Sequence, residues 1–374
     1  MTQKVQPSPF HARTGHANRE NVWTARNGFT LASHYAGAAE EALASRSNAV
    51  IADLSWRPRL ALVGRRAADM LARMMTRNPA KLAIGQAFKA AWLSSEGGVR
   101  GAGVVARAGG DVFIVASAAP DLPWFQQTAA QFKVRLHELT GGGLAVIGRY
   151  AGHVLKQASL DPTLGLLEFR RVRWEDIDIT ISRWGEHGGY ELWCKSSDAI
   201  LVWDRLVRAG EWYGLTPAGV EAMDTLDIEA GVARPERDYD PARGDFDQRP
   251  TPQSLGLERV FDFDHFDFNG RGAWLRMRET DHFVLAGLEL DSDQSAVNTP
   301  VKCGERIVGH TIASCYSPAM RRAIALAQIE ETFSEPGTKL SLTHAPTREQ
   351  PRFRTAKATV AGLPFLAAPG PISP

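Results

Sequence analysis

Side chains that can carry charge or transfer a proton are concentrated in one glycine-rich stretch, ITISRWGEHGGYELW, at residues 179–193. Carboxylate, imidazole, guanidinium and phenol groups occur together there, on Arg183, Glu186, His187, Tyr190 and Glu191. Such groups can bind an anion, accept hydrogen bonds from a ligand or move a proton, provided that the fold brings them to one pocket. An ordinary surface hairpin with a polar tip has the same pattern, so both interpretations stay open at this point.

The residues around this polar set predict how the fold positions it. Apolar residues alternate with polar ones at both ends of the stretch, which indicates two half-buried strands. Gly185, Gly188 and Gly189 interrupt the alternation, and paired glycines indicate a tight reversal or a close approach of two backbones. We therefore expect a β-hairpin whose rigid strands hold the polar turn over a pocket.

Length and composition favour a globular protein of two or three domains, because 374 residues exceed one compact core. Hydrophobic residues make up 44% and charged residues 23% of the chain, which is ordinary for a globular protein. The net charge is +1, so the chain has no basic footprint for nucleic acid or an anionic membrane. We expect a small-molecule substrate, and a monomer or a homodimer.

Cysteine usage and hydropathy predict a cytoplasmic location. Cys194, Cys303 and Cys315 are sparse, odd in number and not at metal-site spacing, which is typical of a reducing compartment. No apolar run approaches the roughly 18–20 residues that cross a bilayer, and the start of the chain lacks a signal-peptide core. We expect no metal site, and we expect Cys194 to be packed beside Trp193 rather than to act as a nucleophile.

The short motifs that identify common reactions are absent from the sequence. It contains no GxxxxGK[ST] phosphate loop, no HExxH, no CxxC and no GxSxG, and GGVRGAG at 97–103 does not satisfy the dinucleotide fingerprint. These motifs therefore do not identify a reaction.

Periodicity predicts a mixture of helices and strands. Short strands at 87–93, 99–107 and 112–117, separated by glycine turns, indicate an antiparallel meander. Residues 217–230 are predicted to form a helix, with Thr216 as its cap and Pro217 at its first position.

The second half of the chain changes character. Residues 234–252 are crowded with charge and proline and are predicted to be a long loop. The alternation FDFDHFDF at 261–268 favours a strand with one buried face over a metal site. From residue 282 onward, strand-like segments divided by glycine and proline turns indicate a separate antiparallel barrel or sandwich.

Several stretches, taken in order, resemble the aminomethyltransferase family, which includes the T-protein of the glycine cleavage system and its folate-dependent demethylase relatives. The resemblance covers roughly residues 8–345. RWGEHGGYE at 183–191 is nearer to the GWSxQGGyE pattern of dimethylsulfoniopropionate demethylase-like members than to the YTGEdGfEi pattern of the T-protein. The other stretches are VIADLS (50–55), NPAKLAIGQAF (78–88), GLTPAGVEAMDTLDIEAG (214–231), TPQSLGLERVFDFDHFDFNGR (251–271) and VGHTIASCYSPAMRRAIALAQI (308–329), which EPGT follows.

The resemblance implies an α+β fold, a three-domain cloverleaf of the aminomethyltransferase type with antiparallel sheets, packed helices and a C-terminal β-barrel. Residues 1–275 would form the folate-binding region as two interleaved α+β domains. Residues 276–366 would form the barrel, and residues 367–374 a disordered tail. Tetrahydrofolate is the cofactor that the family implies, in a central funnel.

Departures from the family pattern bear on the chemistry. The carboxylate that recognises folate in the T-protein aligns with His187, and the acidic pair of GGxxDD aligns with Gly101 and Ala102, which argues against glycine-cleavage chemistry. Recognition of a pterin ring favours an acceptor that faces its N–H donors, so either Glu186 or Glu229 supplies one, or folate binds differently or not at all.

Functional roles can be assigned to nine residues on these grounds. Arg100 would attract a carboxylate, Trp184 would form an aromatic wall, and Arg183 would hold an anionic substrate. The predicted catalytic residues are His187, Glu186 and Tyr190; the predicted cofactor-binding residues are Phe88, Arg100, Trp184, Glu229 and Arg259; the predicted substrate-binding residue is Arg183.

Three hypotheses about function follow. In the first, the protein moves a methyl or methylene group from a small N-, O- or S-linked donor to tetrahydrofolate. In the second, the same funnel serves a folate-independent lyase or demethylase that acts on a small carboxylated substrate, aromatic substrates included. In the third, the chain is a non-catalytic binding protein of the same fold.

Overall fold

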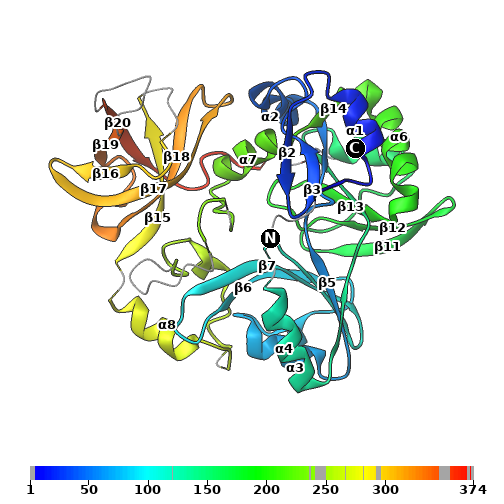
Figure 1. The fold of residues 1–374 in the computed structure, drawn as a ribbon, viewed down its shortest axis with the longest axis horizontal. Coiled ribbons are helices and arrows are strands. Elements are labelled where there is room, and N and C mark those ends of the chain that lie inside the picture. The colour runs from blue at the N-terminus through cyan, green and yellow to red at the C-terminus, as the bar shows by residue number, and fades with distance from the viewer. Residues whose placement is uncertain are drawn as a thin grey trace.

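The computed structural model describes residues 5–119, 121–235, 237–240, 250–265, 267–280, 282–291, 296–344, 354–368 and 371. Three lobes surround a common centre, and each combines a sheet or barrel with its own buried core (Figure 1). This is the α+β cloverleaf with a C-terminal barrel that the sequence predicts. The tail predicted at 367–374 lies mostly outside the described residues.

A six-stranded sheet of order β11-β12-β13-β10-β4-β14 forms the first lobe. The central strands β4 and β10 are apolar over almost their whole length, so the sheet is covered on both faces. Its strands are β4 (Ala49–Asp53), β10 (Gly142–Ile147), β11 (Phe169–Trp174), β12 (Ile177–Ser182), β13 (Tyr190–Cys194) and β14 (Leu215–Ala218). The helices of this region are α2 (Ala38–Ser47), α5 (Ala151–Gln157), α6 (Ala199–Gly210) and α7 (Val220–Glu229), with 3₁₀ turns η2 (Ser196–Asp198) and η3 (Glu211–Tyr213).

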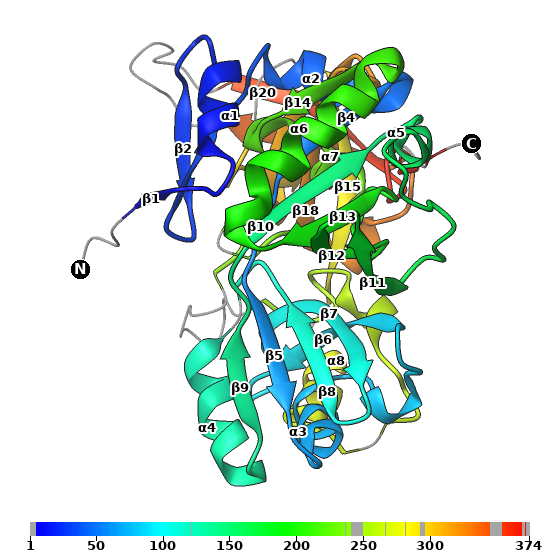
Figure 2. The ribbon, with the colours of Figure 1, turned by 90° about the vertical axis from the view of Figure 1, so that its right-hand side faces the viewer.

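The N-terminal segment lies beside this lobe as a small three-stranded sheet of order β1-β3-β2 (Figure 2). Phe10 is fully buried in the core of the six-stranded lobe, where it packs near Trp203, and this contact attaches the segment. The elements are β1 (Gln6–Pro7), α1 (His11–Ala17), β2 (Trp23–Arg26) and β3 (Phe29–Ala32).

The second lobe is an antiparallel five-stranded sheet of order β6-β7-β8-β5-β9, and its β6-β7-β8 meander confirms the predicted one. The chain enters this sheet after Ser55 and returns to the first at Gly142, so the two lobes are interleaved in sequence. The strands are β5 (Arg59–Val63), β6 (Ala87–Leu93), β7 (Val99–Gly109), β8 (Val112–Ala116) and β9 (Arg135–Glu138); the helices are α3 (Ala67–Met74) and α4 (Leu122–Phe132), with the 3₁₀ turn η1 (Pro79–Lys81).

The third lobe is a closed barrel of order β15-β18-β17-β16-β19-β20, as the sequence predicts from residue 282 onward. Helix α7 lies between this barrel and the six-stranded sheet (Figure 1). Within the described ranges, no helix is both long and apolar enough to cross a membrane. The strands are β15 (Phe283–Leu290), β16 (Pro300–Cys303), β17 (Arg306–Ser317), β18 (Arg322–Glu330), β19 (Lys339–His344) and β20 (Arg354–Ala361); η5 (Leu257–Val260) and α8 (Arg271–Arg278) precede them, and η6 (Glu331–Phe333) follows β18.

The predicted helix start at Pro217 is wrong, because Pro217 lies in strand β14 and α7 begins at Val220. Strand β14 is at the sheet edge and pairs only with β4, so the missing N–H of Pro217 interrupts no ladder. Gly219 precedes the helix, and a Cβ there would lie 2.3 Å from the carbonyl oxygen of Ser33. This close approach sets the helix boundary.

The predicted strand at 261–268 is also wrong. After η5 the backbone wraps over α3, and the Asp262 N–H donates to the carbonyl of Thr76 instead of to a neighbouring strand. The rings of Phe261, Phe263 and Phe268 all lie near Trp274, although Phe263 remains 53% exposed. The aromatic alternation therefore arises from packing around one tryptophan.

We expect alkylation to distinguish the three cysteines sharply. Burial raises the pKa of the Cys194 thiol to about 12 and that of Cys315 to about 12, whereas Cys303 is exposed. Because the thiolate is the reactive form, Cys194 and Cys315 should stay largely unmodified by iodoacetamide near pH 8, while Cys303 reacts. Mass spectrometry of the labelled peptides measures this, and rapid labelling of Cys194 in folded protein would contradict the packing described here.

Candidate functional site

A cavity of about 150 Å³ lies where the two sheets meet the segment that follows α7. Strands β6, β7 and β8 form one wall, and the β12–β13 turn and β13 form a second. The cavity is closed by Val232, Ala233, Arg234, Pro235, Tyr239, Leu255, Leu257, Arg259 and Val260. Its charged lining residues are Arg57, Lys89, Glu186, Glu191, Arg234 and Arg259, and we call this space the central cavity.

The polar turn predicted from the sequence lies at this cavity. Strands β12 and β13 pair in an antiparallel hairpin, as predicted, with Ser182 opposite Glu191. Trp184 and Glu186 from the turn line the central cavity, and Glu191 at the start of β13 faces it as well. The hairpin therefore contributes an indole and two carboxylates to the cavity wall.

Two glycines fix the turn against the neighbouring strand. Gly188 has φ of +69°, a left-handed conformation that favours glycine. A Cβ on Gly189 would lie 2.4 Å from the carbonyl oxygen of Val146 in β10. The turn thus presses directly onto the sheet, and only glycine fits at residue 189.

We expect Gly189→Ala to displace the turn, since a backbone carbonyl cannot move away as a flexible side chain can. The affinity for tetrahydrofolate, the cofactor predicted from the sequence, should fall at least tenfold. The melting temperature of the protein should drop by several degrees. Gly110→Ala is the matched control, because a Cβ there meets nothing within 4 Å. Calorimetry and thermal unfolding of both variants measure the effect, and equal behaviour of the two would contradict this account of the turn.

Hydrogen bonds orient both carboxylates of the turn region. Glu191 accepts from Trp184 Nε1 at 2.6 Å and from an Arg57 guanidinium nitrogen at 2.9 Å. Glu186 accepts from Lys89 Nζ at 2.5 Å through one oxygen. Burial alone would raise the pKa of Glu186, but the charge and hydrogen bond of Lys89, together with the charges of Arg234 and Arg259, outweigh burial and lower it. Glu186 is therefore an anion at neutral pH.

His187 points away from the central cavity, toward α7. Its Nε2 lies 3.0 Å from Oδ1 of Asp227, although off the line that a hydrogen bond requires. Both residues are 3% exposed. Asp227 accepts two hydrogen bonds from Arg234, at 2.6 and 2.5 Å. His187 and Tyr190 line a void of only about 10 Å³ behind the turn, large enough for one water.

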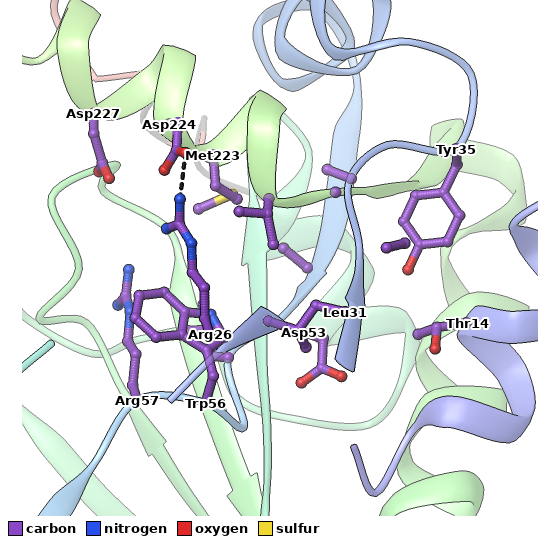
Figure 3. Close-up of a pocket in the computed structure, with 16 residues that line it drawn as sticks. Thr14, Arg26, Leu31, Tyr35, Asp53, Trp56, Arg57, Met223, Asp224 and Asp227 are labelled. Atoms are coloured by element: carbon purple, nitrogen blue, oxygen red, sulfur yellow. Dashed lines mark hydrogen bonds and ion pairs between the residues drawn. The ribbon is translucent and has the colours of Figure 1, made fainter. Parts of the chain in front are cut away.

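A second small cavity, of about 20 Å³, has Asp227 among its lining residues (Figure 3). Figure 3 shows Arg26 extending upward to its partner Asp224, with Trp56 and Arg57 beside it and Asp53 near the middle. Asp53 accepts from the Ser8 hydroxyl and the Ser55 N–H, and burial raises its pKa. Arg57 lines this cavity, the void behind the turn and the central cavity.

Of the six other residues predicted from the sequence, all of which the structure describes, one lines the central cavity and five do not. Arg259 lines it. Arg100 pairs with Asp121 and stacks on Trp124, and Phe88 is buried in the core of the five-stranded lobe. Glu229 forms an ion pair with Arg46 and accepts a hydrogen bond from the Ser317 hydroxyl. Arg183 donates to the backbone carbonyls of Leu164 and Gly188. The Tyr190 hydroxyl donates to the backbone carbonyl of Pro162.

Sequence reasoning did not identify Arg57, Lys89 or Arg234 as cavity residues. Arg57 follows the end of the buried strand β4, a position that often faces a site in sheet proteins, and this is a usable signal. Arg234 lies in a charged stretch that was predicted to be a loop, and its partner Asp227 is on α7. Only the packing of α7 reveals that pair.

Comparison with known proteins places the whole chain in one family. The GCVT N-terminal domain matches residues 12–265, and the glycine cleavage T-protein C-terminal barrel domain matches residues 284–366. The crystal structure of aminomethyltransferase T of the glycine cleavage system from Bartonella henselae shares the fold, with a TM-score of 0.85 at 21% identity over 98% of this chain and 99% of that one.

The relatives of this chain are named for several different activities. Trimethylamine-oxide aldolase of Ruegeria pomeroyi is 30% identical over 84% of this chain, which spans only 42% of the length of that protein. The heme-dependent oxidative N-demethylase gamma subunit of Ectopseudomonas mendocina is 29% identical, and an aminomethyltransferase of Thermoanaerobacter pseudethanolicus is 25% identical. Each of these alignments covers 84% of this chain, and 86% and 87% of the respective relative. The chain therefore belongs to the glycine cleavage T-protein family, the aminomethyltransferase family that its motifs resemble.

Proposed function

We propose that this protein is a tetrahydrofolate-dependent enzyme that takes a methyl or methylene group from a small N-, O- or S-linked donor. One observation carries the proposal: the glycine turn brings the indole of Trp184 and the carboxylate of Glu186 to the wall of one cavity. An aromatic face beside a fixed anion suits a flat ring that carries N–H donors.

The residues of the central cavity fit this cofactor. One oxygen of Glu186 accepts from Lys89, and the other has no donor among the described residues, so it can accept from a pterin N–H. Trp184 and Tyr239 are aromatic residues of the cavity lining, and Arg259 is an exposed cation suited to the carboxylates of a glutamate tail. Bound tetrahydrofolate supplies an amine that accepts the one-carbon group.

The donor class follows from the relatives. Two of them are named for trimethylamine oxide and for N-demethylation, so we propose an N-methylated amine or amine oxide as the donor. In such a reaction the protein chiefly positions the donor carbon and excludes water. Arg57, Lys89 and Glu191 are fixed by mutual or neighbouring hydrogen bonds, which suits that role.

Calorimetry with tetrahydrofolate tests the proposal directly, followed by mass spectrometry of the folate after incubation with dimethylamine or trimethylamine N-oxide. We expect one tetrahydrofolate per chain and a one-carbon adduct on the folate. Absence of folate binding by folded protein would end the proposal.

The proton-transfer role predicted for His187 would run through the water-sized void behind the turn, which shares Arg57, Gly185 and Glu191 with the central cavity, and on that route His187→Ala should lower turnover about 100-fold. Tetrahydrofolate affinity should change little, because His187 lies behind the cavity wall and contacts Asp227. Steady-state rates, with circular dichroism as the folding control, measure this. Unchanged turnover would remove His187 from the reaction.

A folate-independent lyase is the second candidate function. It is favoured by the histidine that stands at the position of the family's folate-recognising carboxylate, and by the relative named an aldolase. The same incubation without folate tests it: substrate consumption at an undiminished rate would select this candidate over the first.

A further inference from the structure

Two buried N–H donors beside the central cavity have no acceptor within the described part of the chain. They are Nε of Arg57 and the indole Nε1 of Trp193. Both residues line the central cavity, and Trp193 is 4% exposed. Buried donors in folded proteins are almost always satisfied by protein, water or ligand, so unpaired donors on residues that line a cavity are candidates to bind a ligand acceptor there.

The surrounding charges favour an anionic acceptor. Glu191, the carboxylate bonded to Arg57, already accepts from Arg57 itself and from Trp184. Lys89 is paired with Glu186, and Arg234 with Asp227. Arg57 and Trp193 thus keep donors that these pairs do not use, and cations outnumber carboxylates among the charged residues that line the cavity.

We propose that the inner part of the central cavity, at Arg57 and Trp193, is a carboxylate subsite for the one-carbon donor. The inference rests on the proposed function and narrows its donor to a small molecule that joins a carboxylate to a methylated cationic nitrogen. Arg57 and the indole N–H hold the carboxylate, which leaves the methylated nitrogen directed toward the pterin that Trp184 and Glu186 bind. Trp193 is itself fixed by the guanidinium of Arg59, 3.5 Å from its ring centroid.

A carboxylate at this position has two sources, the donor and the glutamate tail of the cofactor. The donor is favoured because Trp193 is buried and Arg57 is partly buried, whereas Arg259 is exposed and available to a tail that extends outward. The experiment below separates the two.

Binding of glycine betaine and choline, measured by calorimetry without folate, tests the subsite. The two probes share a trimethylammonium group and differ in the carboxylate. We expect wild-type protein to bind glycine betaine at least tenfold more tightly than choline. Trp193→Phe, which keeps the ring and removes the N–H, should weaken glycine betaine about tenfold and leave choline within twofold. Arg57→Gln should weaken glycine betaine further.

Trp92→Phe is the matched control. Trp92 is also a buried indole without an acceptor among the described residues, but it lies in the core of the five-stranded lobe. It should leave both probes unchanged. Circular dichroism shows whether Arg57→Gln folds, and Trp193→Phe decides the outcome if it does not.

Three results would overturn the subsite: equal affinity of wild type for the two probes, unchanged glycine betaine affinity in Trp193→Phe, or a loss confined to tetrahydrofolate, which would assign the donors to the cofactor. Failure of the proposed function looks different. Tetrahydrofolate would then not bind at all, while the preference for glycine betaine and its sensitivity to Trp193→Phe would persist.

Discussion

Replacing Arg234 with methionine is expected to lower the free energy of unfolding by about 3–5 kcal/mol, because the buried carboxylate of Asp227 loses its main partner. Asp227 is 3% exposed, and Arg234 donates to both of its oxygens. Methionine retains most of the apolar contact of the arginine stem, so loss of the charge dominates the effect. Urea unfolding, followed by both fluorescence and circular dichroism, measures the change.

The free energy of unfolding that Arg234→Met loses should grow as the pH rises. Burial alone would raise the pKa of Asp227, but the charge of Arg234 and the contacts from His187 and Arg234 hold it well below its ordinary value. Ionised Asp227 therefore stabilises the fold above about pH 4, and this stabilisation is lost as the pH falls through the lower folded pKa. Without Arg234, burial raises that pKa, so the variant loses stability as the pH rises. The difference in the free energy of unfolding between wild type and Arg234→Met should therefore increase from about pH 4 to about pH 7.

The double variant Asp227→Asn, Arg234→Met is the control, since it removes the unpaired charge. It should recover at least half of the stability that the single variant loses, because a neutral pair leaves no buried carboxylate uncompensated. Asp227 has a further cation beside it, since a guanidinium nitrogen of Arg237 lies 3.6 Å from its Oδ2. A single variant that stays within about 1 kcal/mol of wild type at every pH would show that His187 and Arg237 suffice to hold Asp227.

Local pattern was enough to predict the elements whose neighbours are close in sequence. The meander β6-β7-β8 and the β12–β13 hairpin follow from apolar alternation and glycine turns, since each strand pairs with the next. The barrel follows for the same reason, with glycine and proline marking its strand ends. Motif resemblance added the cloverleaf arrangement, which no local pattern contains.

Prediction failed where a distant segment decides the conformation. Pro217 favours a helix start by local rules, but β4 recruits residues 215–218 as an edge strand, from more than 150 residues away. Phe261 and Phe268 alternate like strand residues, yet Trp274 organises them and Thr76 binds the intervening backbone.

In the candidate site, too, local sequence predicts some features, and distant segments decide others. The sequence places Glu186 and His187 side by side, but the turn directs Glu186 into the central cavity and His187 to Asp227 behind it. Which neighbour faces a ligand depends on how Gly188 and Gly189 seat the turn on β10, and only coordinates show this. Arg100 and Glu229 each have an ion-pair partner, Asp121 and Arg46 respectively, and their predicted role in cofactor binding stays a prediction.

Replacing Glu186 with glutamine is expected to weaken tetrahydrofolate binding about 10–100-fold, the cost of losing a hydrogen bond to a charged group. Glutamine keeps the length of the side chain and its carbonyl oxygen but loses the charge that Lys89 stabilises. Because Lys89 lowers the pKa of Glu186, wild-type affinity should remain constant as the pH falls from 7 to about 5, where an ordinary glutamate begins to titrate. Calorimetry across this pH range measures both effects.

Glu229→Gln separates a role in the cavity from a role in stability. Glu229 is as fully buried as any carboxylate near the site, but it binds Arg46 and Ser317 at the junction with the barrel and does not face the central cavity. Its replacement should lower the melting temperature and leave tetrahydrofolate affinity within twofold, the reverse of the Glu186 pattern. If Glu229→Gln abolished binding while Glu186→Gln retained it, the ring-recognising carboxylate would belong to α7, and the glycine turn would have no direct part in holding the cofactor.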